Sequence, residues 1–158
     1  MRWKLLDRFD VLKKHSHARA GVRLTGREDF FEDHFPGKSV VPQTLMLEMI
    51  AQTGGVLYGL DIDFEREVIL VKIDGADFIT QIEPPCELVV EAKIVEESES
   101  GARISGTVSC GARQAASAEI LLAAVDSLGD GARKVVFSKR FMETYDVLNV
   151  AKRSELSV

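Results

Sequence analysis

The sequence has few cysteines, no excess of basic residues and no long, clean apolar run. Only two of the 158 residues are cysteines, Cys86 and Cys110, which is too few for a disulfide framework and favours a reducing cytoplasm. A net charge of −5 argues against nucleic-acid binding, which requires a clustered basic face. The charged start, MRWKLLDRFDVLKKHSH, lacks the apolar core of a signal peptide, and no stretch is suited to cross a bilayer. We therefore expect a cytoplasmic protein without nucleic-acid binding or membrane insertion.

What is present is typical of a globular protein. The chain is long enough for one domain with a sizeable core, its hydrophobic share is 46%, and its mean hydropathy is close to zero. No internal repeat or low-complexity tract interrupts it. We expect the two cysteines to pack inside as small apolar residues.

Residues 34–60, HFPGKSVVPQTLMLEMIAQTGGVLYGL, form the most informative stretch. Between Lys38 and Asp61 the single charged side chain is Glu48. A helix that is apolar on all sides is a buried helix, and an isolated carboxylate inside it usually stays neutral with a raised pKa. Glu48 is therefore a candidate for chemistry. The alternatives are a partly exposed position or a salt bridge with Lys38 or Lys72.

Local patterns predict one helix and several strands. Pro42 suits a helix start and Gly59 a helix end, while Gly54 and Gly55 could let a neighbouring backbone approach. Alternation or β-rich composition predicts strands over residues 18–25, 66–79 (one strand, or two with a break at 74–75), 87–96, 102–110 and 113–125, and a strand or irregular lead-in over 3–14. The alanine-rich stretch 113–125 could be helical by propensity, but it follows a turn at Gly111 and we assign it as a strand. This order indicates an α+β fold with the sheet wrapped round the helix.

Composition changes after Val125. We expect residues 1–127 to form the main domain and residues 128–158 a C-terminal extension with a helix near 139–151. The extension is either a loosely docked tail or an arm that packs on another subunit.

His15 and His17 are the only other histidines. Their spacing could suit a metal, but no cysteine or carboxylate cluster in the sequence supports them, and metal sites need three or four ligands. We interpret both as surface residues and expect no metal site.

The motif HFPGKxxxPxxLxLExxAQ resembles the core motif of the hot-dog-fold β-hydroxyacyl-acyl-carrier-protein dehydratases of bacterial fatty acid synthesis. His34 and Glu48 stand 14 residues apart, as the catalytic histidine and acid of that family do. The resemblance extends weakly through IDGADF and covers roughly residues 5–125. It implies a hot-dog fold, with an antiparallel sheet wrapped around one long central helix.

The resemblance also implies a function. It implies dehydration of (3R)-3-hydroxyacyl-acyl-carrier-protein to the trans-2-enoyl thioester, with His34 and Glu48 as catalytic residues and no cofactor. It assigns Gly37, Gln43 and Gln52 to substrate or oxyanion contacts. In the family, the histidine and the acid of one site come from different subunits, so a homodimer at least is implied, with a trimer of dimers left open.

These residue types suit the reaction. A histidine can remove the C2 proton near neutral pH, and a neutral carboxylic acid can protonate the departing C3 hydroxyl. The free N–H groups at the helix start, near Pro42, could stabilise the developing enolate. Gln52 lies one turn after Glu48 and could orient its carboxyl group.

Two departures from the family pattern keep other functions open. The family has Pro-Gly at the helix start, whereas this chain has Pro42-Gln43, which keeps the N–H donor but adds a side chain near the thioester; Pro85-Cys86 replaces a later Gly-Asp. The change could be tolerated, alter substrate preference or abolish activity. The alternatives are a hot-dog acyl thioesterase and a non-catalytic homologue that binds acyl chains or acyl-carrier protein.

Acyl-carrier proteins are acidic, so the mouth of the site should be basic despite the acidic total. Lys38, Lys72, Arg103 and Arg113 are the candidate contributors, although charged residues on strands often form only a solvated face.

Overall fold

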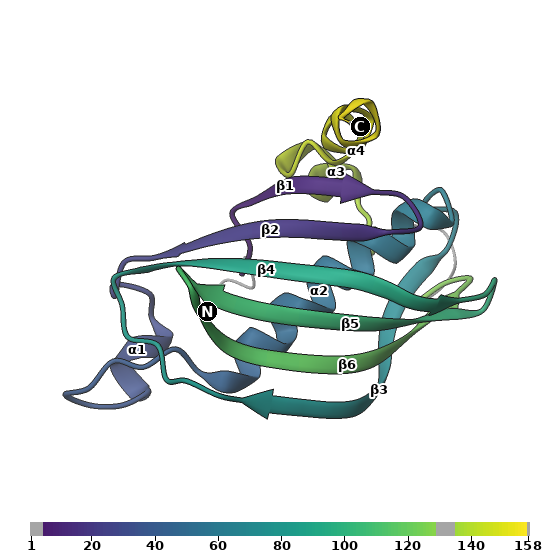
Figure 1. Cartoon of the computed structure of the whole chain (residues 1–158). Helices are drawn as coiled ribbons and strands as arrows, with labels where there is room; N and C mark the ends of the chain where they lie inside the picture. The colour runs from purple at the N-terminus through teal and green to yellow at the C-terminus, as the bar shows by residue number, and fades with distance from the viewer. Residues whose placement is uncertain (1–4, 129–134, 158) are drawn as a thin grey trace.

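The computed structural model describes residues 5–128 and 135–157, in which a curved antiparallel sheet wraps around the long helix α2 (Gln43–Asp61) (Figure 1). The order across the sheet is β1-β2-β4-β5-β6-β3, and each neighbouring pair is antiparallel. The strands are β1 (Arg8–Lys13), β2 (His17–Leu24), β3 (Glu67–Phe78), β4 (Cys86–Glu97), β5 (Gly101–Cys110) and β6 (Arg113–Val125). The short helices are α1 (Phe30–Asp33), α3 (Lys139–Thr144) and α4 (Val147–Leu156).

Helix α2 fills the concave side of the sheet. Met46, Met49, Ile50 and Leu57 are at most 1% exposed, and the helix contacts β2 to β6. Close approach depends on glycine, because a Cβ added to Gly106 of β5 would lie 2.3 Å from Cγ2 of Ile50. The sequence therefore predicted the helix correctly, but not the close contact between Ile50 of the helix and Gly106 of β5.

The predicted end of the helix at Gly59 is wrong. The helix continues to Asp61, and Gly59 is needed for packing, since an added Cβ would lie 2.6 Å from Cζ of Phe137. Residues 113–125 are a strand, as predicted. Residues 67–78 form a single strand whose register with β6 shifts between Ile73 and Gly75.

The C-terminal extension forms two helices rather than one and packs on its own chain. Helix α4 lies against β1 (Figure 1). The Tyr145 hydroxyl donates to the Leu6 carbonyl at 3.0 Å, and the Leu12 N–H donates to Ser154 Oγ at 3.0 Å. Buried residues such as Val150 join the common core, so the extension is firmly docked and covers the β1 edge of the sheet.

The opposite edge of the sheet, β3, is exposed and partly apolar. The exposed large apolar side chains along it are Leu70, Val71, Ile73, Phe78 and Ile79. None of the described helices combines the length and the apolar character needed to span a membrane.

Candidate active site

His34 stands at the end of a tight loop after α1. Two backbone hydrogen bonds join Phe35 and Lys38, with N···O distances of 2.8 and 2.9 Å. Pro36 fits the second position of this turn, and Gly37 has a φ of +80°, which glycine adopts without steric cost. The predicted role of Gly37 in a fixed loop therefore has a backbone explanation.

The loop also holds the His34 ring in one orientation. Its Nδ1 lies 3.1 Å from the carbonyl oxygen of Val40, and the Val40 N–H donates to the His34 carbonyl at 3.0 Å. Because a carbonyl oxygen can only accept, Nδ1 carries the proton of this bond. The neutral ring then presents the lone pair of Nε2, which is the arrangement required of a base.

Glu48 and Gln52 form a hydrogen-bonded pair on one face of α2. The Gln52 Nε2 donates to Glu48 Oε1 at 2.9 Å, as the spacing of one helical turn suggested. Both line a pocket of about 300 Å³, whose other walls are mainly apolar side chains from α2, β3, β6 and residues 136–141. A carboxyl group, an amide and an apolar cavity therefore meet at one place.

The expectation of a fully buried Glu48 is wrong for the single chain. Glu48 is half-buried, as is its neighbour Leu47, whereas Met49 and Ile50, which follow them on α2, are fully buried. The alternative of a salt bridge is also wrong within the described residues: Lys38 pairs with Glu83 at 3.6 Å, and Lys72 with Asp74 at 2.6 Å.

The start of α2 offers free backbone donors. Pro42 has extended dihedral angles and caps the helix, and Gln43 is its first residue, one position later than predicted. Within the described part of the chain, the Gln43 N–H has no hydrogen-bond partner, and the Gln43 side chain is exposed. The Gln43 side chain therefore makes no hydrogen bond to its own backbone N–H, which stays available as a donor.

One chain does not bring all the predicted site residues together. Among the described residues no hydrogen bond or ion pair joins His34 to Glu48, and His34 is not part of the wall of the pocket that Glu48 lines. The site of a single chain therefore consists of two separate parts.

The basic residues expected at the mouth are mostly neutralised. Lys72 and Arg103 both pair with Asp74, and Lys38 pairs with Glu83. Of the four candidates, only Arg113 has no carboxylate partner among the described residues.

Sequence reasoning missed a cluster at the far end of α2. His15, Asp61 and Glu97 each place a possible ligand atom within 4.8 Å of the others. His15 Nδ1 lies 2.7 Å from Glu97 Oε1, and the His15 N–H donates to Asp61 Oδ1 at 2.6 Å. No local pattern joins these residues, which come from a turn, a helix end and a strand end.

Cys86 is unsuited to nucleophilic chemistry. It is half-buried, as is Cys110, and burial raises the pKa of the Cys86 thiol to about 11. The thiolate, which is the reactive form, is therefore scarce at neutral pH.

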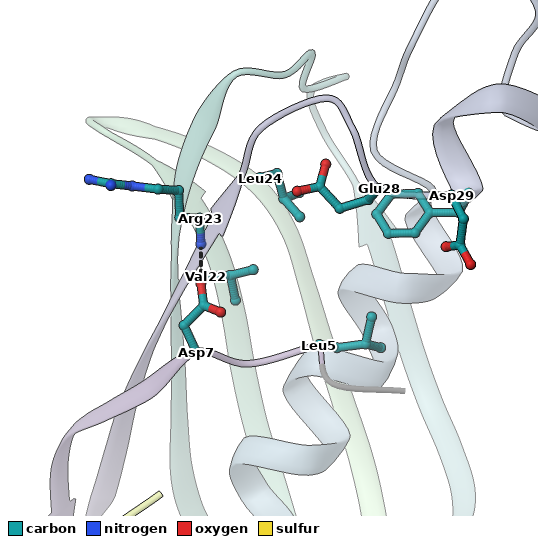
Figure 2. Close-up of a pocket in the computed structure, with 8 residues that line it drawn as sticks. Leu5, Asp7, Val22, Arg23, Leu24, Glu28 and Asp29 are labelled. Carbon is teal, nitrogen blue, oxygen red and sulfur yellow. Dashed lines mark hydrogen bonds between the residues drawn. The ribbon is translucent and has the colours of Figure 1, made fainter. Parts of the chain in front are cut away.

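A larger pocket, of about 480 Å³, lies between β2 and α1 and contains none of the predicted site residues. Figure 2 shows Leu5 and Val22 on its wall and the Arg23 guanidinium pointing away from it. The backbone N–H of Arg23 donates to the Asp7 carboxylate at 2.6 Å. Burial opposes ionisation of Glu28, but hydrogen bonds from the backbone of Thr25 and Gly26 outweigh it and lower the Glu28 pKa. The carboxylates of Asp7 and Glu28 are thus already engaged in local structure.

A curved antiparallel sheet around one central helix, with a half-buried acid on that helix, defines a hot-dog protein with a candidate acid–base site. The model of the FabA-like domain matches residues 2–119, which is most of the chain. The chain belongs to the FabA-like domain family.

Comparisons with individual proteins agree with this family. The 3-hydroxyacyl-[acyl-carrier-protein] dehydratase FabZ of Ralstonia nicotianae is 31% identical over 131 residues, which are 80% of this chain and 80% of the relative. The dehydratase heterocomplex ApeI:P from Xenorhabdus doucetiae superposes with a TM-score of 0.62 at 15% identity, over 77% of this chain and 82% of that chain. A mutant thioesterase from Pseudomonas aeruginosa gives 0.61 at 11% identity, over 74% and 79%. Because the sequence identities to these two solved structures are only 15% and 11%, the superpositions establish the hot-dog fold and not the reaction.

Proposed function

We propose that this protein is a hydro-lyase that dehydrates 3-hydroxyacyl-acyl-carrier-protein to the trans-2-enoyl thioester in fatty acid synthesis, in the cytoplasm. The observation that carries the proposal is the Glu48–Gln52 pair at an apolar pocket, on a chain that shares 31% identity with a FabZ dehydratase over most of its length. An acid beside an apolar cavity suits a substrate with a reacting head and an acyl chain.

In the proposed reaction His34 and Glu48 move one proton each. Nε2 of His34 takes the proton from C2, the C2=C3 double bond forms, and the C3–O bond breaks. Glu48 protonates the departing hydroxyl, which leaves as water. The reaction transfers protons and involves no net oxidation or reduction, so amino-acid side chains can supply every catalytic group that the reaction needs.

The remaining residues position these two. The Val40 carbonyl holds Nδ1–H of His34 and so fixes the tautomer with a free Nε2. The amide of Gln52 holds one carboxyl oxygen of Glu48, leaving the other oxygen to carry the transferred proton. The free N–H of Gln43 is the proposed oxyanion donor, and Gly37 permits the turn that places His34.

A homodimer at least is the proposed active unit. The two catalytic groups belong to separate parts of one chain, and the exposed, partly apolar β3 edge is a surface that could pair with a second copy. A lysine at Ile73, which is 45% exposed, should be harmless to one chain but disfavour such pairing. Analytical ultracentrifugation should show wild type as a dimer, or as six chains if dimers assemble further, and Ile73→Lys as a less active monomer. A fully active monomer would contradict this assembly.

The reaction is tested with purified protein and 3-hydroxyacyl thioesters of acyl-carrier protein. His34→Ala and Glu48→Gln should each lower the rate by about 10²–10⁴-fold, which is the usual contribution of acid–base groups. His17→Ala and Glu119→Gln are matched controls outside the site and should retain activity. Turnover unaffected by both site substitutions would overturn the role assignment.

The same assay separates the other two functions. A thioesterase would release free thiol, which a thiol reagent detects, without forming an enoyl product. A non-catalytic homologue would bind acyl-acyl-carrier protein without turnover, and Gln43→Gly would then be the variant in which to look for restored elimination.

A further inference from the structure

The C-terminal extension contributes part of the wall of the pocket beside Glu48. Glu48, Gln52 and Gly55 lie on one face of α2 and form one wall, with Ile69 of β3 opposite. The aromatic side chains of Phe137 and Phe141 complete the lining. We call this pocket, between Glu48 and the two phenylalanines, the acyl slot.

The slot runs along the helix from a polar end to an aromatic end. Phe137 packs on α2 at Gly59, eleven residues after Glu48, which is about 16 Å along a helix axis. Between them the helix face offers Ala51, Gly55 and Val56, which carry no polar side-chain atom. A ligand with a polar head and an apolar chain fits this gradient, and its chain would point toward the phenylalanines.

The aromatic end is held firmly. The buried carboxylate of Glu67, 1% exposed, accepts hydrogen bonds from the backbone N–H groups of Val135 and Val136, the latter at 3.2 Å. The ring of Phe137 packs edge-on against Phe64, with centroids 4.9 Å apart, and against Phe141 at 6.3 Å. The segment is therefore a fixed wall in this structure.

We propose that Phe137 and Phe141 form the floor of the acyl slot and set the maximum length of acyl chain that the protein accepts. The inference rests on the proposed function, whose substrate it narrows to acyl thioesters of limited chain length. The match to the family model ends at residue 119, so the floor comes from a segment outside that match. In this proposal, the residues that select the length of the acyl chain are different from the residues that carry out the acid–base chemistry.

Two substitutions should shift the chain-length preference in opposite directions. Phe141→Ala shortens a half-buried floor residue and should move the optimum to longer chains, with at least a tenfold change in the long-to-short ratio of kcat/KM. Gly55→Met adds a side chain where a Cβ meets nothing within 4 Å, so it should fold normally, fill the slot and move the optimum to shorter chains. Met142→Ala removes a neighbouring half-buried side chain that does not line the slot, and it should leave the ratio unchanged.

The measurement uses the full-length protein and 3-hydroxyacyl thioesters of four, eight, twelve and sixteen carbons. Binding of the matching saturated acyl thioesters is measured in parallel by calorimetry. If Phe141→Ala shifts the chain-length preference to longer chains and Gly55→Met shifts it to shorter chains, the proposed floor of the acyl slot is supported. An unchanged length profile in Gly55→Met overturns it even if Phe141→Ala proves too unstable to assay.

The two measurements separate this inference from the proposed function. If no thioester is dehydrated but the binding profile shifts as expected, the floor stands and the reaction does not. If dehydration is robust but neither variant alters the length profile, the reaction stands and the floor does not.

Discussion

The buried carboxyl group of Asp61 should make the stability of the protein depend on pH. Its side chain is 2% exposed at the end of α2, and Oδ2 has no hydrogen-bond partner in the described structure. Burial raises the pKa of Asp61 to about 6; the hydrogen bond from the His15 backbone N–H opposes this rise, and the neighbouring Glu97 carboxylate adds to it. The folded protein therefore keeps a proton that the unfolded chain releases at lower pH.

The sign and size of the effect follow from this difference. The ordinary pKa is 3.8, so between about pH 4 and about pH 6 the folded state binds more protons than the unfolded state. The free energy of unfolding therefore falls as pH rises through this window and levels off above it. The difference between the ordinary pKa of 3.8 and a pKa of about 6 corresponds to at most about 3 kcal/mol of unfolding free energy.

Asp61→Asn isolates this contribution. The amide keeps an acceptor for the His15 N–H and can donate to Glu97, but it cannot ionise. In urea titrations the variant should gain stability over wild type as pH rises from about 4 to about 7, by up to about 3 kcal/mol. Asp63→Asn is the matched control, since that side chain is 72% exposed and, within residues 5–128 and 135–157, its charge pairs only with Lys14. A difference between Asp61→Asn and wild type that stays constant across the range would refute the reasoning.

Two further predictions concern the packing of α2 and the docking of the extension. Gly54→Ala and Gly55→Ala both gain about 1 kcal/mol of helix propensity, but an added Cβ at Gly54 lies 2.9 Å from Ile104, whereas one at Gly55 meets nothing within 4 Å. Thermal unfolding should therefore find Gly55→Ala more stable than Gly54→Ala by about 1–3 kcal/mol, and equal stability would contradict the close approach. Glu67→Gln leaves one of the two N–H groups at residues 135–136 without a buried acceptor, so it should cost about 1–3 kcal/mol and speed hydrogen exchange there; unchanged exchange would show that this contact does not hold the extension.

The helix and the strands could be predicted because their patterns are local. A proline start and a long apolar run marked α2, and alternation marked β5. The stretch 113–125 was ambiguous by composition, since alanine favours helices. It is a strand because β5 and β3 pair with it on both sides and occupy its backbone groups. Tertiary pairing thus overrides the local helix propensity.

The surroundings of Glu48 could not be predicted from the same run of residues. Uniformly apolar neighbours imply burial on every side, but Glu48 is only half-buried in the single chain. The pocket beside it is formed by β3, β6 and residues 136–141, and this last segment lies far along the chain and carries no pattern pointing to α2. The Asp61 cluster was missed for a similar reason, because His15 and Glu97 reach it only through the register of β2 on β4.

The two edges of the sheet explain why the extension and the proposed partner occupy different surfaces. On the β1 edge, Ser154 of α4 accepts the Leu12 N–H, so this helix takes up a group that another strand would otherwise bind. None of the described residues pairs with the free side of β3, and this edge exposes large apolar side chains. Strand addition is therefore blocked on one side and open on the other. The half-buried Glu48 lies in a pocket lined by β3, so the homodimer proposed above would pair beside the site that it is proposed to complete.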